Sequence, residues 1–156
     1  MKKTYFYDLL IVVLVLALGY AGYRLAPLLH PQADLSLPMS NCDLNRNDCS
    51  VALPAGGQLR FRITPRPIPS LKTLDLDVQL TGTPAQKVEV DLAGADMEMG
   101  YNRPLLQEVA PGHYTGTGSL QICITGPMRW QATVLVDTGR QHVAVPFRFL
   151  SGAASQ

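Results

Sequence analysis

Apolar and polar residues alternate with a period of two along much of the chain after residue 58. The alternation is clearest in segments 59–63, 74–80, 88–92, 120–124, 128–136 and 143–149. In an extended strand successive side chains point to opposite faces, so each segment would have one apolar face and one polar face. Strands of this kind are typical of antiparallel sheets that cover a shared core.

Turn-forming sequences separate these segments. They occur at Thr64–Pro67, Thr81–Pro84, Pro111-Gly112, Gly126-Pro127 and Thr138-Gly139. Gly permits left-handed backbone conformations and Pro pre-sets the backbone of a turn, so both residues punctuate strands. The spacing predicts an all-β domain over residues 41–150. We expect an immunoglobulin-like antiparallel sandwich of about seven strands, followed by a tail at residues 151–156.

The N-terminal region has no such alternation. Residues 9–23 carry no charged side chain, and the apolar stretch extends over 5–29 if Asp8 and Arg24 reach toward the interfaces. We therefore expect a single N-terminal transmembrane helix within residues 1–29, and a Pro-containing tether over residues 30–40. A cleaved signal peptide, with Gly19-Tyr20-Ala21 as its cleavage site, is the alternative interpretation.

Lys2 and Lys3 precede the apolar stretch. Positive charge is retained on the cytoplasmic side of a membrane helix, so the C-terminal domain is expected outside the cytoplasm. The expected location is the inner (cytoplasmic) membrane, with a single pass and a periplasmic domain. The membrane is then the first partner of the chain.

Charge and composition exclude some functions. The chain has 13 basic and 12 acidic residues, a net charge of +1, and no basic cluster beyond Lys2-Lys3, so we expect no nucleic-acid binding. No nucleophile elbow, phosphate loop or Ser-His-Asp order is present in the sequence. The protein is therefore not expected to be an enzyme.

The chain has three cysteines, and cysteines can form disulfides in an oxidising compartment. Cys42 and Cys49 bracket a polar, turn-prone loop, and we expect a structural disulfide between them. The alternative is a thiolate pair that binds a soft metal or exchanges disulfides, although redox pairs usually have two intervening residues. Cys123 would point away from Leu120, Ile122 and Ile124, either as a half-buried side chain or as an exposed, oxidation-prone thiol.

The methionines provide the candidate metal ligands. Met97 and Met99 would project to the same side of an extended strand, on either side of Glu98. Thioether and thiolate ligands are soft and select Cu(I). Together with Cys123 and Met128, and with His113 as a further candidate, they are sufficient for a copper site. The alternative is that both methionines only fill the core.

The region 97–136 resembles a known family. Its order is Met97-x-Met99-Gly100, Leu105-Leu106, Pro111-Gly112-x-Tyr114-x-Gly116, Gly126, Trp130, and the alternating Ala132, Val134 and Val136. This order is similar to the YtkA-like/FixH-like periplasmic domain family. The resemblance implies an immunoglobulin-like sandwich with a membrane anchor. Some relatives are associated with copper supply or cytochrome oxidase assembly, which would make Met97 and Met99 ligands. The three cysteines, and the lack of a His near Met97 and Met99, depart from the family pattern.

These observations predict a membrane-anchored copper-handling or cytochrome oxidase assembly factor. It would bind Cu(I) through Met97, Met99, Cys123 and Met128, and its partner would be a membrane oxidase or a metallochaperone. The first alternative is a structural or interaction module of a membrane complex, with no metal. A thiol–disulfide enzyme based on Cys42 and Cys49 is the second alternative.

Overall fold

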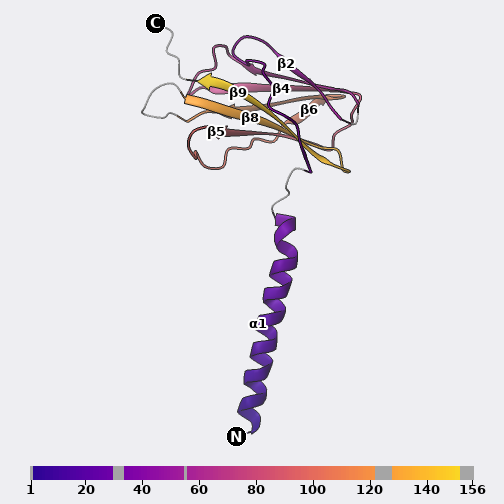
Figure 1. The fold of residues 1–156 in the computed structure, drawn as a ribbon, viewed down its shortest axis with the longest axis vertical. Helices are drawn as coiled ribbons and strands as arrows, with labels where there is room; N and C mark the ends of the chain where they lie inside the picture. Colours follow the sequence, from indigo (N-terminus) through magenta and orange to yellow (C-terminus); the bar gives the residue numbers. More distant parts are fainter. Residues whose placement is uncertain (1, 30–33, 55, 122–127, 152–156) are drawn as a thin grey trace. The chain divides into compact units, whose positions relative to one another are not determined.

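The structure is a computed structural model, and it describes residues 2–29, 34–54, 56–121 and 128–151. The chain divides into two units, residues 1–32 and residues 33–156. The first unit is the helix α1 (Lys2–Leu29), shown in indigo in Figure 1. Within the described part of the chain, no helix combines the length and apolar character that crossing a membrane requires.

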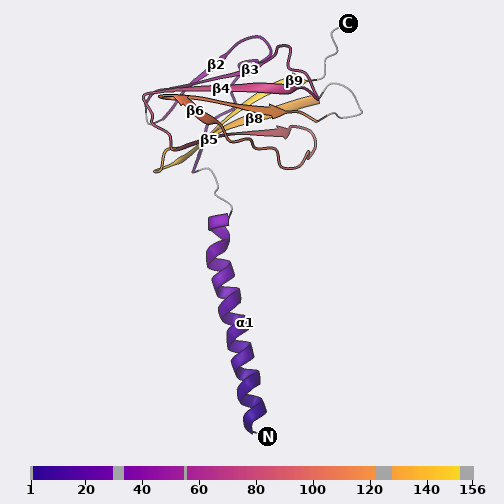
Figure 2. The same cartoon turned by 180° about the vertical axis from the view of Figure 1, so that it is seen from behind.

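The second unit consists of two β-sheets. The four-stranded sheet has the order β1 (Leu35–Ser36), β9 (His142–Ser151), β8 (Met128–Asp137) and β5 (Lys87–Gly94). The five-stranded sheet has the order β2 (Cys49–Ala52), β3 (Gln58–Thr64), β4 (Thr73–Thr81), β7 (His113–Ser119) and β6 (Gln107–Ala110). Figures 1 and 2 show the sheets from opposite sides. All named neighbours are antiparallel except the parallel pair of β1 and β9.

One hydrophobic core lies between the sheets. Buried and less buried residues alternate along β3, β4, β5 and β8, as the period-two pattern predicts. Phe61 of the five-stranded sheet faces Phe147 of the four-stranded sheet with ring centroids 5.5 Å apart. Trp130 is also buried in this core. The prediction of a mostly β, sandwich-like fold is therefore confirmed.

Strand β7 was not among the predicted strands. Its sequence contains Gly116 and Gly118, which interrupt the apolar pattern. A Cβ at Gly116 would lie 2.5 Å from Leu106 Cδ2, and one at Gly118 would lie 3.0 Å from Leu92 Cδ1. The glycines therefore make room for two core leucines. Of the predicted segment 120–124, Leu120 is buried just after β7, Gln121 is in no strand, and the other residues lie outside the described ones.

Part of the expected tether belongs to the β unit. Leu35 and Ser36 form β1 beside Val143 and Ala144, and Ser40 bridges to Phe147. Backbone pairing at a sheet edge needs no alternation of side chains, so the pattern of the sequence does not reveal it. At the other end, β9 includes Ser151, the first residue of the expected tail, whose buried Oγ donates to the carbonyl of Ile68 at 3.1 Å.

Residues 102–106 carry the chain from one sheet to the other. The amides of Leu92 and Val90 donate to the carbonyls of Asn102 and Pro104 at 2.9 and 3.1 Å. The amide of Leu106 donates to the carbonyl of Val88 at 2.9 Å. This segment covers the edge of β5 and fixes both ends of the connection that contains Met97 and Met99.

Candidate functional site

Two methionine side chains, those of Met99 and Met128, and the backbone of Met97 come together at the end of β5, around Gly94. Gly94 pairs with Trp130 of β8, and Met128 begins the same strand. A Cβ at Gly94 would collide with Cε of Met128 and with the carbonyl oxygen of Met97, and would lie 2.9 Å from Cγ of Met99. Since these atoms surround the same point, the side chains of Met99 and Met128 lie side by side over Gly94.

The three methionines differ in their exposure. Met128 is 7% exposed and belongs to the core, whereas Met99 is partly buried and packs against that core. Met97 is 44% exposed. Met97 and Met99 both line an open hollow of about 530 Å³, together with Gly94, Glu98, Tyr101 and Arg103. Solvent therefore reaches the group from the side of Met97 and Met99.

The connection that carries Met97 and Met99 is a bend and not the predicted extended strand. Residues 95–97 turn the chain immediately after β5. The alternation of Met97, Glu98 and Met99 imitates a strand, but the three residues lie outside the named strands. Of the two, only Met99 has a side chain that packs against the core. The expectation that Met97 and Met99 lie in an extended strand is therefore corrected, although both residues line the same hollow.

An ion pair fixes this bend to the start of β8. Arg129 donates two hydrogen bonds to the carboxylate of Asp96, from Nε at 3.0 Å and from Nη2 at 2.7 Å. The amide of Ala95 also donates to the carbonyl of Arg129 at 2.9 Å. These hydrogen bonds hold the pKa of Asp96 below its usual value, and Asp96 in turn raises the pKa of Arg129. The bidentate pair thus holds the bend that carries Met97 and Met99 against the start of β8.

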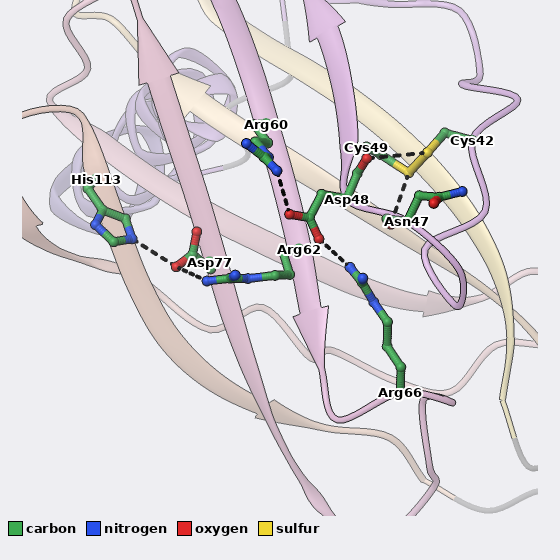
Figure 3. Close-up of polar contacts among 9 residues, drawn as sticks. All are labelled: Cys42, Asn47, Asp48, Cys49, Arg60, Arg62, Arg66, Asp77 and His113. Atoms are coloured by element: carbon green, nitrogen blue, oxygen red, sulfur yellow. Dashed lines mark hydrogen bonds and ion pairs between the residues drawn. A yellow bond between two sulfur atoms is a disulfide. The ribbon is translucent and has the colours of Figure 1, made fainter.

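The remaining predicted ligands are placed as follows. Cys123 lies outside the described residues, so its role as a ligand stays a prediction. His113 is engaged on the five-stranded sheet, where its Nε2 lies 2.8 Å from the carboxylate of Asp77, which also accepts a hydrogen bond from Arg62 (Figure 3). The described residues include no cluster of three His, Cys, Asp or Glu side chains suited to a metal ion. Thioethers are therefore the soft donors that the described part of the chain brings together.

The predicted disulfide between Cys42 and Cys49 is present, with Cα atoms 5.7 Å apart. Asp48, beside it, pairs with Arg66 at 2.7 Å and with Arg60 at 2.9 Å (Figure 3). Burial raises the pKa of Asp48, but the hydrogen bonds and charges of the two arginines outweigh this effect and lower it. The bridge therefore lies beside a charged network on the five-stranded sheet.

Two features that hold the methionine site in place are not predicted from the sequence. Gly94 follows the alternating segment 88–92 and is the last residue of β5. An isolated Gly at a strand end indicates that other groups approach the backbone closely. The pairing of Asp96 with Arg129 joins residues that are far apart in the sequence, and no local pattern indicates it. The motif residues of the resemblance have structural roles: Gly112 has a φ of 73°, and the hydroxyl of Tyr114 donates to the carbonyl of Ala85 at 3.1 Å.

Comparisons with known proteins identify no relative of known function. No family model matches the chain, and no curated protein matches it. Among solved structures, an engineered protein of known crystal structure is similar over 64% of this chain, with 17% sequence identity and a TM-score of 0.46. The chain spans only 21% of the length of that protein. A likeness at this level carries no argument about function.

Proposed function

We propose that this protein binds Cu(I) through methionine thioethers at the end of its sandwich, as a copper-handling factor of the cytochrome oxidase assembly type. The observation that supports this proposal is the meeting of Met99, Met128 and the Met97 segment around Gly94. Met99 and Met128 are the primary donors, and Met97 is the exposed donor through which the ion enters. Cys123 remains a proposed further ligand.

The chemistry of the donors favours this ion. A thioether is soft and neutral, and it binds without losing a proton, so it selects Cu(I) over harder divalent ions. A single exposed methionine would be an ordinary surface residue, and a single buried one would be core filler. In the pair of Met99 and Met128, Met128 belongs to the core and Met99 lines an open hollow, so the pair is held in place and is reached by solvent through Met99.

Substitution of the proposed methionine ligands tests the copper site directly. We expect the full chain, purified with its disulfide intact and loaded with Cu(I) in the absence of oxygen, to bind one Cu(I), measured by competition with a chromogenic chelator. Replacing Met99 and Met128 with Leu should weaken binding about tenfold or more, which corresponds to about 1.4 kcal/mol. The fold should remain, because exchange of Met for Leu conserves volume.

Met39→Leu is the matched control, since Met39 lies in a different segment at the surface. It should leave copper binding unchanged. Cys123→Ser, measured alongside, determines whether the thiol contributes. Equal copper affinity in the wild type and in the double Met99/Met128 variant would reject the thioether site.

An interaction module without metal is the second candidate function. The segment before β7 has three exposed large apolar side chains, those of Tyr101, Leu105 and Val109. Such side chains are frequent at contacts with other proteins. If the chain binds no copper, this surface becomes the better explanation of its function.

We also propose that α1 anchors the protein in the inner membrane and that the β unit, an immunoglobulin-like sandwich, lies in the periplasm. The uncharged segment 9–23, with Lys2 and Lys3 before it, supports this orientation. The disulfide supports an oxidising compartment. The resemblance to the YtkA-like/FixH-like family implies the same setting, with a membrane oxidase or metallochaperone as partner.

A reporter fused after Gln156 tests the orientation. Alkaline phosphatase folds only outside the cytoplasm, so this fusion is expected to be active, whereas a fluorescent reporter that needs the cytoplasm should be dark. The proposed orientation fails if the two reporters give the reverse result. In that case the disulfide would also need another explanation, because thiols are kept reduced in the cytoplasm.

A further inference from the structure

A cleft of about 640 Å³ opens at the other end of the sandwich from Gly94. Gly94 pairs with Trp130 at one end of the β5–β8 ladder, and Lys87 pairs with Asp137 at the opposite end. The cleft lies at this opposite end, where the residues after β2, between β4 and β5, and between β8 and β9 come together. It is therefore separate from the methionine site.

The floor of the cleft is apolar. Leu53, Val136 and Val143 line it, and all three are buried members of the core. Pro54 and Pro84 also line it, and a proline has no backbone N–H to offer a ligand. A ligand that rests on this floor needs an apolar body, because a polar group would lose its hydrogen bonds to water there.

The charged side chain at the rim of the cleft is that of Arg140. The hydroxyl of Thr138 already donates to the carbonyl of Gln141 at 3.1 Å, and the hydroxyl of Thr83 donates to the carbonyl of Gly56 at 2.7 Å. Arg140 forms no ion pair with any residue that the structure describes. Among the described residues that line the cleft, none carries a carboxylate. The rim thus presents one guanidinium without an opposing charge.

The chain around the cleft is closely packed at Gly82, which lines the cleft, and at Gly139 nearby. A Cβ at Gly82 would lie 3.0 Å from Cα of Gly57, and one at Gly139 would collide with the side chain of Gln86. The amide of Gln86 donates to the carbonyl of Asp137 at 2.7 Å, which ties the β4–β5 connection to the end of β8. A ligand would therefore enter a site that is already formed, which lowers the entropic cost of binding.

We propose that this cleft binds a small apolar carboxylate, with its carboxylate on Arg140 and its alkyl body on Leu53, Val136 and Val143. A guanidinium holds a carboxylate by two parallel hydrogen bonds. The volume lies within the range of small-molecule sites, which is roughly 300–1,000 Å³. The proposal is independent of copper, because it uses none of the methionines.

Hexanoate is the probe for this site. We expect saturable chemical-shift changes at the methyl groups of Leu53, Val136 and Val143 when hexanoate is added to the full chain. Hexanol, which lacks the charge, should bind about fivefold more weakly, as expected for an exposed ion pair worth at most about 1 kcal/mol. Hexylamine, whose charge is repelled by Arg140, should bind more weakly than hexanol, and acetate should leave these signals unchanged.

Substitution of single arginines tests where the carboxylate of hexanoate binds. Arg140→Gln should weaken hexanoate binding about fivefold and leave hexanol binding unchanged. Arg148→Gln is the matched control, because Arg148 is another exposed arginine on the following strand and does not line the cleft. The proposal is overturned if hexanoate causes no saturable change at these methyl groups, if hexanol binds equally well, or if Arg140→Gln binds hexanoate as the wild type does.

Discussion

Replacing Gly94 with valine should destabilise the β unit and disrupt the methionine site together. The first added atom would collide with Cε of Met128 and with the carbonyl oxygen of Met97. The methionine side chain can move, but the carbonyl belongs to a bend that Arg129 holds to β8. Overpacking of this kind costs about 1–3 kcal/mol, and the rigid backbone neighbour places this case near the upper end.

The copper affinity of the Gly94→Val variant should fall as well, because the intruding side chain separates Met99 from Met128. Chemical denaturation measures the first effect, and chelator competition at a temperature where the variant stays folded measures the second. Gly100→Asn is the matched control. Gly100 has a φ of 76° and would meet nothing within 4 Å of an added Cβ, and Asn tolerates this backbone conformation better than most residues. A Gly94→Val variant as stable as Gly100→Asn would contradict the packing described here.

Alternation in the sequence predicts a strand where burial alternates strictly. β3, β4, β5 and β8 bury every second residue, so segments such as 74–80 and 128–136 reveal them directly. The short strand β1 has only two residues, which pair with β9. Strand β7 contains glycines that leave room for the side chains of Leu106 and Leu92. Neither strand has a side-chain pattern that could be read in advance.

The candidate site was predictable in its chemistry but not in its geometry. The soft donors Met97, Met99 and Met128 are visible in the sequence because their residue type alone selects Cu(I). The close approach of Met99 and Met128 depends on Gly94, which has no side chain, and the pairing of Asp96 with Arg129 holds the bend that carries Met97 and Met99. By contrast, the disulfide joins cysteines with a sequence separation of only 7, across a loop rich in turn-forming residues, so local sequence was sufficient.

Removal of this disulfide should lower the free energy of unfolding by about 2.5 kcal/mol on the chain-entropy model, because the bridge closes a loop of about eight residues. The loop also carries contacts that the bridge keeps in place. Leu44 is fully buried, and the side chain of Asn45 joins two distant segments. Its Nδ2 donates to the carbonyl of Leu150 at 2.8 Å, and its Oδ1 accepts a hydrogen bond from the amide of Ile68 at 2.9 Å. We therefore expect faster hydrogen exchange at Ile68 when the bridge is absent.

Two comparisons separate the cross-link from the packing of the sulfur atoms. Urea unfolding of the oxidised and the reduced wild type differs only in the covalent bond, and this difference should be the larger one. The reduced wild type and the Cys42→Ala, Cys49→Ala variant differ in the volume that the side chains fill, and Cys49 is fully buried. This second difference should be smaller, because each substitution removes only one sulfur atom. Equal stability of the oxidised and reduced wild type would show that the tight packing of Leu44 and the hydrogen bonds of Asn45 hold the loop closed without the bridge.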